Sequence, residues 1–173
     1  FKPKNVTATD PAEAVMTDLR KVASASIRAE ASLERAHQMM IQRGVRMLIV
    51  ANDEGQISGL ITSNDVMGEK PVTVAQKHGI KRGELKVRDI MIHTDHVQVL
   101  HMSDVAKAEV GNVISTLKHA GRAHALVVDQ VNGKLSLIGI FSANQIARQM
   151  GIQIHTHEVA RTFAEIEAVL VGV

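Results

Sequence analysis

Apolar residues follow two alternating patterns along the chain, one typical of an amphipathic helix and one of a buried strand. Within residues 33–43, Leu33, Ala36 and Met40 recur at the spacing of one helical face. Residues 45–51 are almost continuously apolar, which is typical of a strand with both faces covered. Ser32 and Gly44 bound the first of these segments, as an N-cap and a C-terminal stop do. The pattern therefore predicts a helix at 33–43 followed by a strand at 45–51.

The same reasoning predicts further elements, with turns wherever polar residues and glycine gather. In chain order we expect a short helix at about 11–17, strands at 25–28 and 57–62, a helix at 63–67, a solvated linker at 68–86, a short helix at 87–91, a strand at 97–100, a helix from Ser103 to 120, strands at 122–129 and 135–141, and helices at 142–150 and 155–171.

The second half of the chain repeats the first. The correspondence pairs Met16 with Met91, Leu33 with Val110, Gly44 with Gly121, Gly59 with Gly139, and Thr62 with Ser142. Neither half covers its own sheet well, so we expect an α+β fold of two pseudo-symmetric β-α-β-β-α repeats packed sheet to sheet. The expected divisions are a loose lead-in at 1–10, a first repeat with its linker at 11–86, a second repeat at 87–151, and a C-terminal helix at 152–173.

In each half a glycine and a hydroxyl residue mark the point where a strand passes into a helix. The first copy reads GLITSND at 59–65 and the second reads GIFSANQ at 139–145. A helix start presents free N–H groups and a positive dipole, which suit a phosphate. Asp65 lies one turn past Thr62, and its carboxylate can accept hydrogen bonds from a vicinal diol such as ribose. Hydroxyl, helix start and carboxylate together indicate a nucleotide site.

Composition limits the remaining possibilities. With 45% apolar and 22% charged residues, the 173-residue chain is typical of a globular protein. A net charge of +2 is too small to indicate a nucleic-acid partner by itself. No apolar run approaches the ~20 residues of a membrane span, and the absence of cysteine fits the cytoplasm. We expect no enzyme, because the chain has no cysteine, no glycine-framed nucleophilic serine and no close carboxylate pair.

Taken in order, these motifs resemble the CBS domain, which is named after cystathionine β-synthase. Residues 15–16, 32–36, 44–50, 52–55 and 59–65 carry the likeness in the first half, and 87–145 in the second. A tandem pair of this kind is called a Bateman module. The resemblance implies a regulatory or sensor protein that is not an enzyme. It also implies clefts between the repeats that bind AMP, ADP, ATP or S-adenosylmethionine, a homodimer, and an effector protein that is not identified.

The resemblance also implies which residues contact the ligand. Thr62 resembles the family's hydroxyl contact to phosphate or ribose, Asp65 its ribose carboxylate, and Arg46 a position that often meets phosphates. The further positions are Ser26 and Ile27 on the strand that edges the base, Ser142 and the neutral Gln145 in the second repeat, and His124 near the second phosphate-facing position.

The same residues also have simpler, purely structural interpretations. Thr62 could be only an N-cap, Asp65 only a first-turn acid, and Arg46 only a surface arginine. Scattered histidines at 93, 96, 101, 155 and 157 lack the spacing of a metal site, and we expect none.

Two other functions stay open. Gln145 and the apolar face of the last helix favour a dimerisation or protein-interaction module with a degenerate nucleotide site. Nucleic-acid binding through Lys77, Lys81, Arg82 and Lys86 ranks last, since these residues share no aromatic stacking platform.

Overall fold

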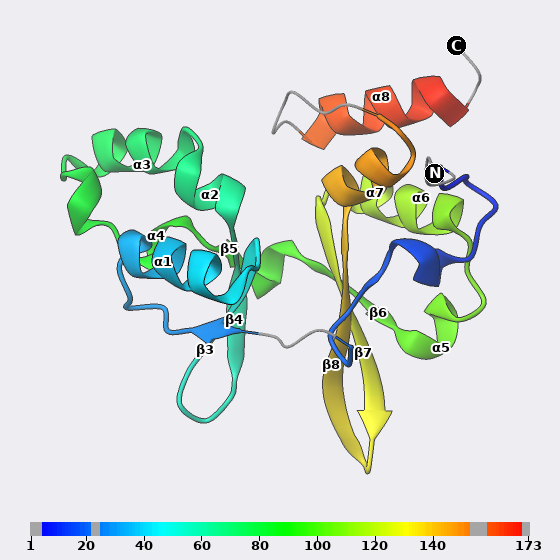
Figure 1. Cartoon of the computed structure of the whole chain (residues 1–173), viewed down its shortest axis with the longest axis horizontal. Helices are drawn as coiled ribbons and strands as arrows, with labels where there is room; N and C mark the ends of the chain where they lie inside the picture. The colour runs from blue at the N-terminus through cyan, green and yellow to red at the C-terminus, as the bar shows by residue number, and fades with distance from the viewer. Residues whose placement is uncertain (1–4, 22–24, 153–158, 171–173) are drawn as a thin grey trace. The chain divides into compact units, whose positions relative to one another are not determined.

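The structure is a computed structural model (Figure 1) that describes residues 5–21, 25–152 and 159–170. The described residues form two four-stranded sheets with helices packed on them, which confirms the α+β fold. Packing divides the chain into two compact units. Unit 1 comprises 1–22 and 97–173, and unit 2 comprises 23–96. The sheet-to-sheet packing of the repeats stays a prediction.

Unit 2 has strands in the order β2-β3-β4-β5, with β2 parallel to β3 and the other pairs antiparallel. Its core joins Leu48, Val50 and Ile61 of the sheet to the apolar face of α1. The elements are β2 (Ser26–Ile27), α1 (Leu33–Arg43), β3 (Met47–Ala51), β4 (Ile57–Thr62), α2 (Ser63–Met67), α3 (Lys70–His78), η2 (Arg82–Glu84), α4 (Val87–Ile90), β5 (Ile92–His93) and η3 (Thr94–His96).

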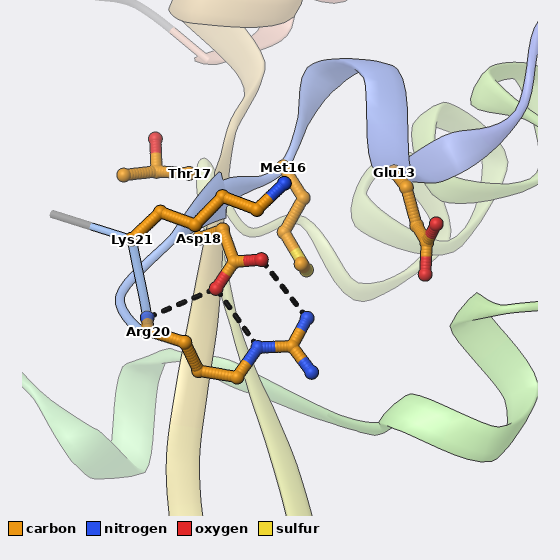
Figure 2. A pocket seen from close by; sticks show the side chains of 6 residues that line it. All are labelled: Glu13, Met16, Thr17, Asp18, Arg20 and Lys21. Carbon is orange, nitrogen blue, oxygen red and sulfur yellow. Dashed lines mark hydrogen bonds and ion pairs between the residues drawn. The ribbon is translucent and has the colours of Figure 1, made fainter.

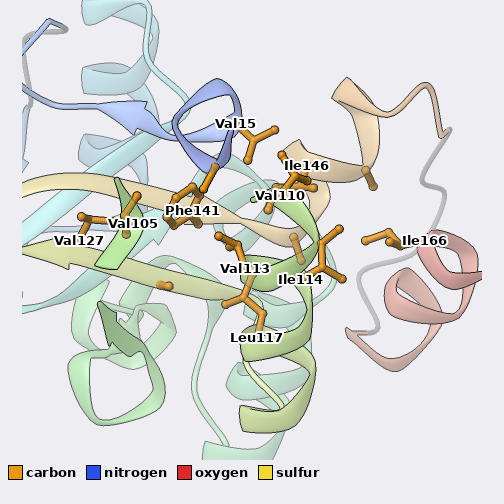
Figure 3. Packing of buried hydrophobic residues seen from close by; sticks show 14 of the residues in the cluster. Val15, Val105, Val110, Val113, Ile114, Leu117, Val127, Phe141, Ile146 and Ile166 are labelled. Carbon is orange, nitrogen blue, oxygen red and sulfur yellow. The ribbon is translucent and has the colours of Figure 1, made fainter. Parts of the chain in front are cut away.

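Unit 1 has strands in the order β1-β8-β7-β6, and only β6 and β7 are parallel. Its core gathers Phe141 with apolar side chains from several helices (Figure 3). The elements are η1 (Ala12–Val15), β1 (Thr17–Asp18), β6 (Gln98–His101), α5 (Met102–Val105), α6 (Val110–Ala120), β7 (His124–Val131), β8 (Lys134–Ser142), α7 (Ala143–Gln149) and α8 (Val159–Leu170).

Each sheet is completed by a short segment of the other repeat. Strand β1, from the start of the first repeat, pairs with β8, whereas β5, from the start of the second repeat, pairs with β4. A Cβ atom added at Gly139 would lie 2.5 Å from Met16 Sδ, and one added at Gly59 would collide with the carbonyl oxygen of Ile92. The two glycines therefore admit the incoming segments. Sequence repeat and packing unit are different divisions of this chain.

Local signals placed several elements correctly. Helix α1 has the predicted bounds, because Ser32 Oγ accepts a hydrogen bond from Arg35 N at 3.1 Å and Gly44 ends the helix with φ 64°. Strand β4 and helix α2 also begin and end where the sequence predicts. The last predicted helix is observed as α8, and its predicted start at 155–158 lies outside the described residues.

Two predictions were wrong. The predicted linker contains helix α3, because Pro71 sits in the first turn, where a missing N–H costs nothing, and Gly79 ends the helix at φ 65°. The helix predicted from Ser103 is broken into α5 and α6. Residues 6–10 cause the break: the carbonyls of Ala8 and Asp10 accept the first N–H groups of α6, each at 2.9 Å.

The lead-in at 1–10 is therefore not loose throughout, because Val6 N also donates to Gln149 O at 2.9 Å.

Among the described residues, every helix is too short or too polar to cross a bilayer.

Candidate functional site

The strand-to-helix junction of unit 2 is built as a reciprocal cap. Thr62 ends β4 and is the N-cap of α2. Its Oγ1 accepts a hydrogen bond from Asp65 N at 3.2 Å and donates to Asp65 Oδ2 at 2.9 Å. Thr62 N also donates to Oδ2, at 2.9 Å. The capping roles are confirmed, and they hold the carboxylate in one orientation. Ligand contact by either residue stays a prediction.

The other carboxylate oxygen of Asp65 is less occupied. Oδ1 accepts no hydrogen bond from the described residues, and Lys70 Nζ lies 3.8 Å away as an ion-pair partner. Lys70 Nζ also donates to Ile90 O at 2.6 Å, which links α3 to α4. A carboxylate offers about four acceptor positions, and Thr62 fills two, so Oδ1 is open to further donors. Sequence reasoning missed Lys70, because it stood in the presumed linker.

The structure brings Arg46 next to this junction through the backbone. Its carbonyl accepts a hydrogen bond from Ser63 N at 2.8 Å, and its neighbour Met47 is the register partner of Thr62. The Arg46 side chain is exposed and forms no ion pair with the described residues. The main chain of Arg46 therefore lies beside the start of α2, and its guanidinium group is accessible to solvent.

Strand β2 places its two predicted contact residues on opposite faces. Ser26 is exposed, whereas the Ile27 side chain is 5% exposed and belongs to the core of unit 2. Successive side chains of a strand point to opposite faces, so only one of these two can face a ligand. The Ile27 side chain is committed to packing, and only its main chain is available.

The junction of unit 1 differs from that of unit 2. Ser142 Oγ accepts a hydrogen bond from Gln145 N at 3.4 Å, which is a long cap. Gln145 Oε1 accepts from Thr17 Oγ1 at 3.2 Å, and Gln145 Nε2 donates to Gln149 Oε1 at 3.3 Å. The amide that replaces the acid thus bonds to strand β1 and to the next turn of α7.

His124 does not occupy the position equivalent to Arg46. It is the register partner of Ser142, as Met47 is of Thr62. The equivalent of Arg46 is Ala123, whose carbonyl accepts a hydrogen bond from Ala143 N at 2.8 Å. His124 therefore lies one strand position further on, and on the other face.

A hollow of about 440 Å³ lies beside strand β1 in unit 1 (Figure 2). At the edge of this hollow the Arg20 guanidinium forms a bidentate pair with the Asp18 carboxylate: Nε donates to Oδ1 and Nη2 donates to Oδ2, each at 2.9 Å. These hydrogen bonds lower the pKa of Asp18 and raise the pKa of Arg20. Sequence reasoning assigned the hollow no role. Its lining residues are Glu13, Met16, Thr17, Asp18, Arg20 and Lys21.

The remaining sequence candidates are not assembled into a site. In the described part of the chain, no three His, Cys, Asp or Glu side chains gather as metal ligands would, and His155 and His157 lie outside that part. Arg82, counted among the basic residues that could meet a nucleic acid, donates from Nη2 to Val66 O at 2.9 Å. Arg82 thus ties η2 to the end of α2.

Comparisons with known proteins show which domain and which structures the chain is similar to. Residues 4–72 match the family model of the CBS domain. A comparison with curated protein sequences gives no match. Among solved structures, the chain is similar to a conserved protein from Pyrococcus horikoshii, with a TM-score of 0.56 and 20% identity over 87% of this chain and 99% of that one.

Two further structures share the fold. One is the CBS domain of the bacterial CNNM/CorC family Mg²⁺ transporter, solved with the inhibitor IGN95a: TM-score 0.54, 16% identity, 85% of this chain and 79% of that one. The other is a CBS-domain-containing protein from Agrobacterium tumefaciens: TM-score 0.53, 17% identity, 86% and 96%. Residues 4–72 thus match a CBS domain, and the fold over most of the chain is similar to that of these structures.

Proposed function

We propose that the chain is a regulatory module that binds an adenosine-containing ligand, AMP, ADP, ATP or S-adenosylmethionine, at the Thr62–Asp65 junction. The observation that carries the proposal is the state of the Asp65 carboxylate. Its side chain is 14% exposed, Thr62 donates two hydrogen bonds to Oδ2, and Oδ1 lies 3.8 Å from the Lys70 ammonium group. A carboxylate held in this way is ready to accept the two hydroxyl groups of a ribose.

The neighbouring groups suit the rest of such a ligand. The exposed Arg46 guanidinium, fixed through its carbonyl to Ser63, supplies positive charge for a phosphate. Ser26 is exposed on the edge strand β2 and offers a hydroxyl for a base or sugar. A small organic molecule on this fold has precedent, since the CBS domain of the CNNM/CorC transporter was solved with an inhibitor bound.

The mechanism is a shift between two states of unit 2. A ribose bound at Asp65 Oδ1 competes with Lys70 for the same oxygen, and Lys70 also holds Ile90 O. A ligand that loosens Lys70 therefore changes the link between α3 and α4. A ligand shifts an equilibrium only as far as it binds the two states differently, so the four candidates need not act alike. The change is reported to an effector protein.

Unit 1 is expected to bind such ligands weakly or not at all. Gln145 is neutral and already bonded to Thr17 and Gln149, so a ribose would have to displace an intrachain hydrogen bond. A hydrogen bond to a charged group is about twice as strong as a neutral one. The proposal also includes a homodimer that is not an enzyme and acts in the cytoplasm.

Isothermal titration of the full chain with each of the four ligands tests the proposal. Asp65→Asn keeps an oxygen for the cap of α2 but removes the charge, and we expect it to weaken binding by about tenfold to a hundredfold. Asp53→Asn is the matched control, because Asp53 is an exposed carboxylate paired with Arg28 at 2.9 Å. The proposal is wrong if all four ligands give no heat, or if Asp65→Asn binds as tightly as the wild type.

A second candidate is a protein-interaction module with a degenerate site. One observation favours it: Ile41 and Met67, on two neighbouring helices of unit 2, are 68% and 65% exposed. Size measurement without any ligand separates the two candidates, since an interaction module associates whether or not a nucleotide is present.

A further inference from the structure

Helix α3 contributes little to the core of unit 2. Its buried side chains are those of Pro71 and Ala75, and both are small. The helix packs against α2, α4 and η2 (Figure 1). A helix of nine residues is marginal on its own in water, so these contacts must hold it in place. Its position in unit 2 therefore depends on how the ends of the segment are attached.

Basic side chains attach both ends of the segment from α3 to η2. At its start, Lys70 Nζ donates a hydrogen bond to Ile90 O of α4 at 2.6 Å and lies 3.8 Å from Asp65 Oδ1 of α2. At its end, Arg82 Nη2 donates to Val66 O of α2 at 2.9 Å. The outward side of the segment takes no part in these attachments, and its side chains remain exposed to solvent.

This outward side combines basic and apolar residues. Four exposed residues of α3 recur at the spacing i, i+1, i+4 and i+5, which places them on one side of the helix, and two more follow Gly79, which ends it. We call this surface the α3–η2 face. It consists of Val72, Thr73, Gln76, Lys77, Ile80 and Lys81. No member is acidic, and the two apolar members, Val72 and Ile80, are 50% and 37% exposed.

Positive charge is concentrated in this segment. Between residues 70 and 84 the sequence has four Lys or Arg and one Glu, a net charge of +3, whereas the whole chain carries +2. Lys77 and Lys81 form no ion pair with any residue that the structure describes. Complementary charge steers two proteins together and selects the partner. A partner of this face should therefore carry carboxylates.

We propose that the α3–η2 face binds a segment of an effector protein that is both acidic and apolar. The carboxylates of this segment pair with Lys77 and Lys81, and its apolar side chains cover Val72 and Ile80. A nucleic acid fits the face less well, because residues 70–84 include no aromatic side chain on which bases could stack. Two lysines also neutralise few phosphates, and nucleic-acid affinity depends on that number.

Lys70 connects this face to the nucleotide site, in a step that rests on the proposed function. Lys70 and Lys77 are seven residues apart, which is about two turns along the same side of α3. A ligand that occupies Asp65 Oδ1 displaces the Lys70 ammonium group, whose charge then adds to that of the α3–η2 face. The ligand and the acidic partner therefore favour each other's binding, and this coupling acts equally in both directions.

Fluorescence anisotropy of the full chain without nucleotide tests the docking. The probe is a labelled helical peptide of about 18 residues with Glu along one side and Leu along the other. We expect a dissociation constant of about 10–100 µM, raised about tenfold in the double variant Lys77→Glu, Lys81→Glu. The matched control is Lys107→Glu, Lys134→Glu, which makes the same change in net charge at exposed lysines of unit 1 and should bind like the wild type.

A single variant tests the apolar part of the contact. Val72→Thr keeps the shape of the side chain and should weaken peptide binding about twofold to fivefold. Val169→Thr on α8 is its control, because Val169 is 49% exposed and Val72 is 50% exposed.

A charge-swapped peptide gives a readout that damage to the fold cannot imitate. This second peptide has Lys in place of Glu. It should bind the Lys77→Glu, Lys81→Glu protein more tightly than it binds the wild type, because the pairs are restored with the signs exchanged.

Two variants of the Lys70–Asp65 pair test the coupling. Asp65→Asn leaves the Lys70 charge unbalanced and should tighten binding of the acidic peptide about twofold to fivefold, whereas Lys70→Met removes that charge and should weaken binding by about the same factor. Equal binding of the peptide by these two variants overturns the coupling.

Three results overturn the docking: no binding of the acidic peptide up to about millimolar concentration, equal losses in the two double variants, or equal binding of a peptide made of Glu alone. A single-stranded oligonucleotide that binds more tightly than the peptide would make the partner a nucleic acid and would overturn it as well. The peptide titrations contain no nucleotide, so their failure leaves the proposed function standing. A chain that binds the peptide but none of the four adenosine-containing ligands refutes the proposed function alone.

Discussion

Gly59→Ala and Gly139→Ala should differ in cost, although the two glycines are equivalent in the repeat. At Gly59 the added methyl group meets the carbonyl oxygen of Ile92, a backbone atom held by the β4–β5 pairing. At Gly139 it meets Met16 Sδ at 2.5 Å, near the end of a side chain that can rotate. The first obstacle is rigid and the second can yield.

The magnitudes follow from this difference. Overpacking costs about 1–3 kcal/mol, and replacing glycine by alanine in a strand returns about 0.5–1 kcal/mol. Gly59→Ala should therefore lower the free energy of unfolding by about 1–2 kcal/mol. For Gly139→Ala, moving the methionine off its rotamer costs about 0.5–1.5 kcal/mol, so the net change should be close to zero.

Urea unfolding followed by far-ultraviolet circular dichroism measures both variants, since the chain has no Trp or Tyr to report by fluorescence. Adding Met16→Ala should remove the remaining cost of Gly139→Ala. Adding Met91→Ala should not rescue Gly59→Ala, because the carbonyl oxygen stays in place. A Gly59→Ala protein as stable as the wild type, or less damaged than Gly139→Ala, would refute the reasoning.

Three further outcomes are expected. Thr62→Val should cost about 1–2 kcal/mol in urea unfolding and Ser142→Ala less, because the Ser142 cap is the longer one; equal costs would contradict the capping geometry. Arg20 lowers the pKa of Asp18, so this carboxylate stabilises the fold above its unfolded pKa and ceases to do so as the pH falls through the folded value; NMR titration should place the Asp18 pKa below that of an unperturbed aspartate. Phe163→Ala should release α8 at a cost of about 3 kcal/mol, seen as faster hydrogen exchange in α8 and not in unit 2.

Sequence reasoning succeeded where the deciding interactions are local. The bounds of α1 follow from Ser32 and Gly44, and the Thr62–Asp65 cap spans a single helical turn. It failed where distant residues decide. Nothing near Ser103 shows that Ala8 and Asp10 will bond to the start of α6 and break the predicted helix.

The candidate site shows the same limit. Asp65 was recognised from its spacing to Thr62, but its neighbour Lys70 was not, because α3 was read as a linker. The glycine of GLITSND was recognised as a mark of the strand-to-helix junction, but the segment that packs over it, strand β5 with Met91, was not. Gln145, which distinguishes the junction of unit 1 from that of unit 2, was identified from the sequence. Its partner Thr17 was not, because it lies 128 residues earlier in the chain.

Because β1 and β5 each complete the sheet of the other repeat, they restrict where the chain can be divided into fragments that fold. A fragment that ends at residue 86 lacks the edge strand of its own sheet and leaves one side of β4 without hydrogen-bond partners, a surface prone to aggregation. A fragment of residues 23–96 keeps that strand and the methionine over Gly59 and contains the whole of unit 2, so we expect it to fold alone. The other unit offers no such piece, because its strands come from both ends of the polypeptide.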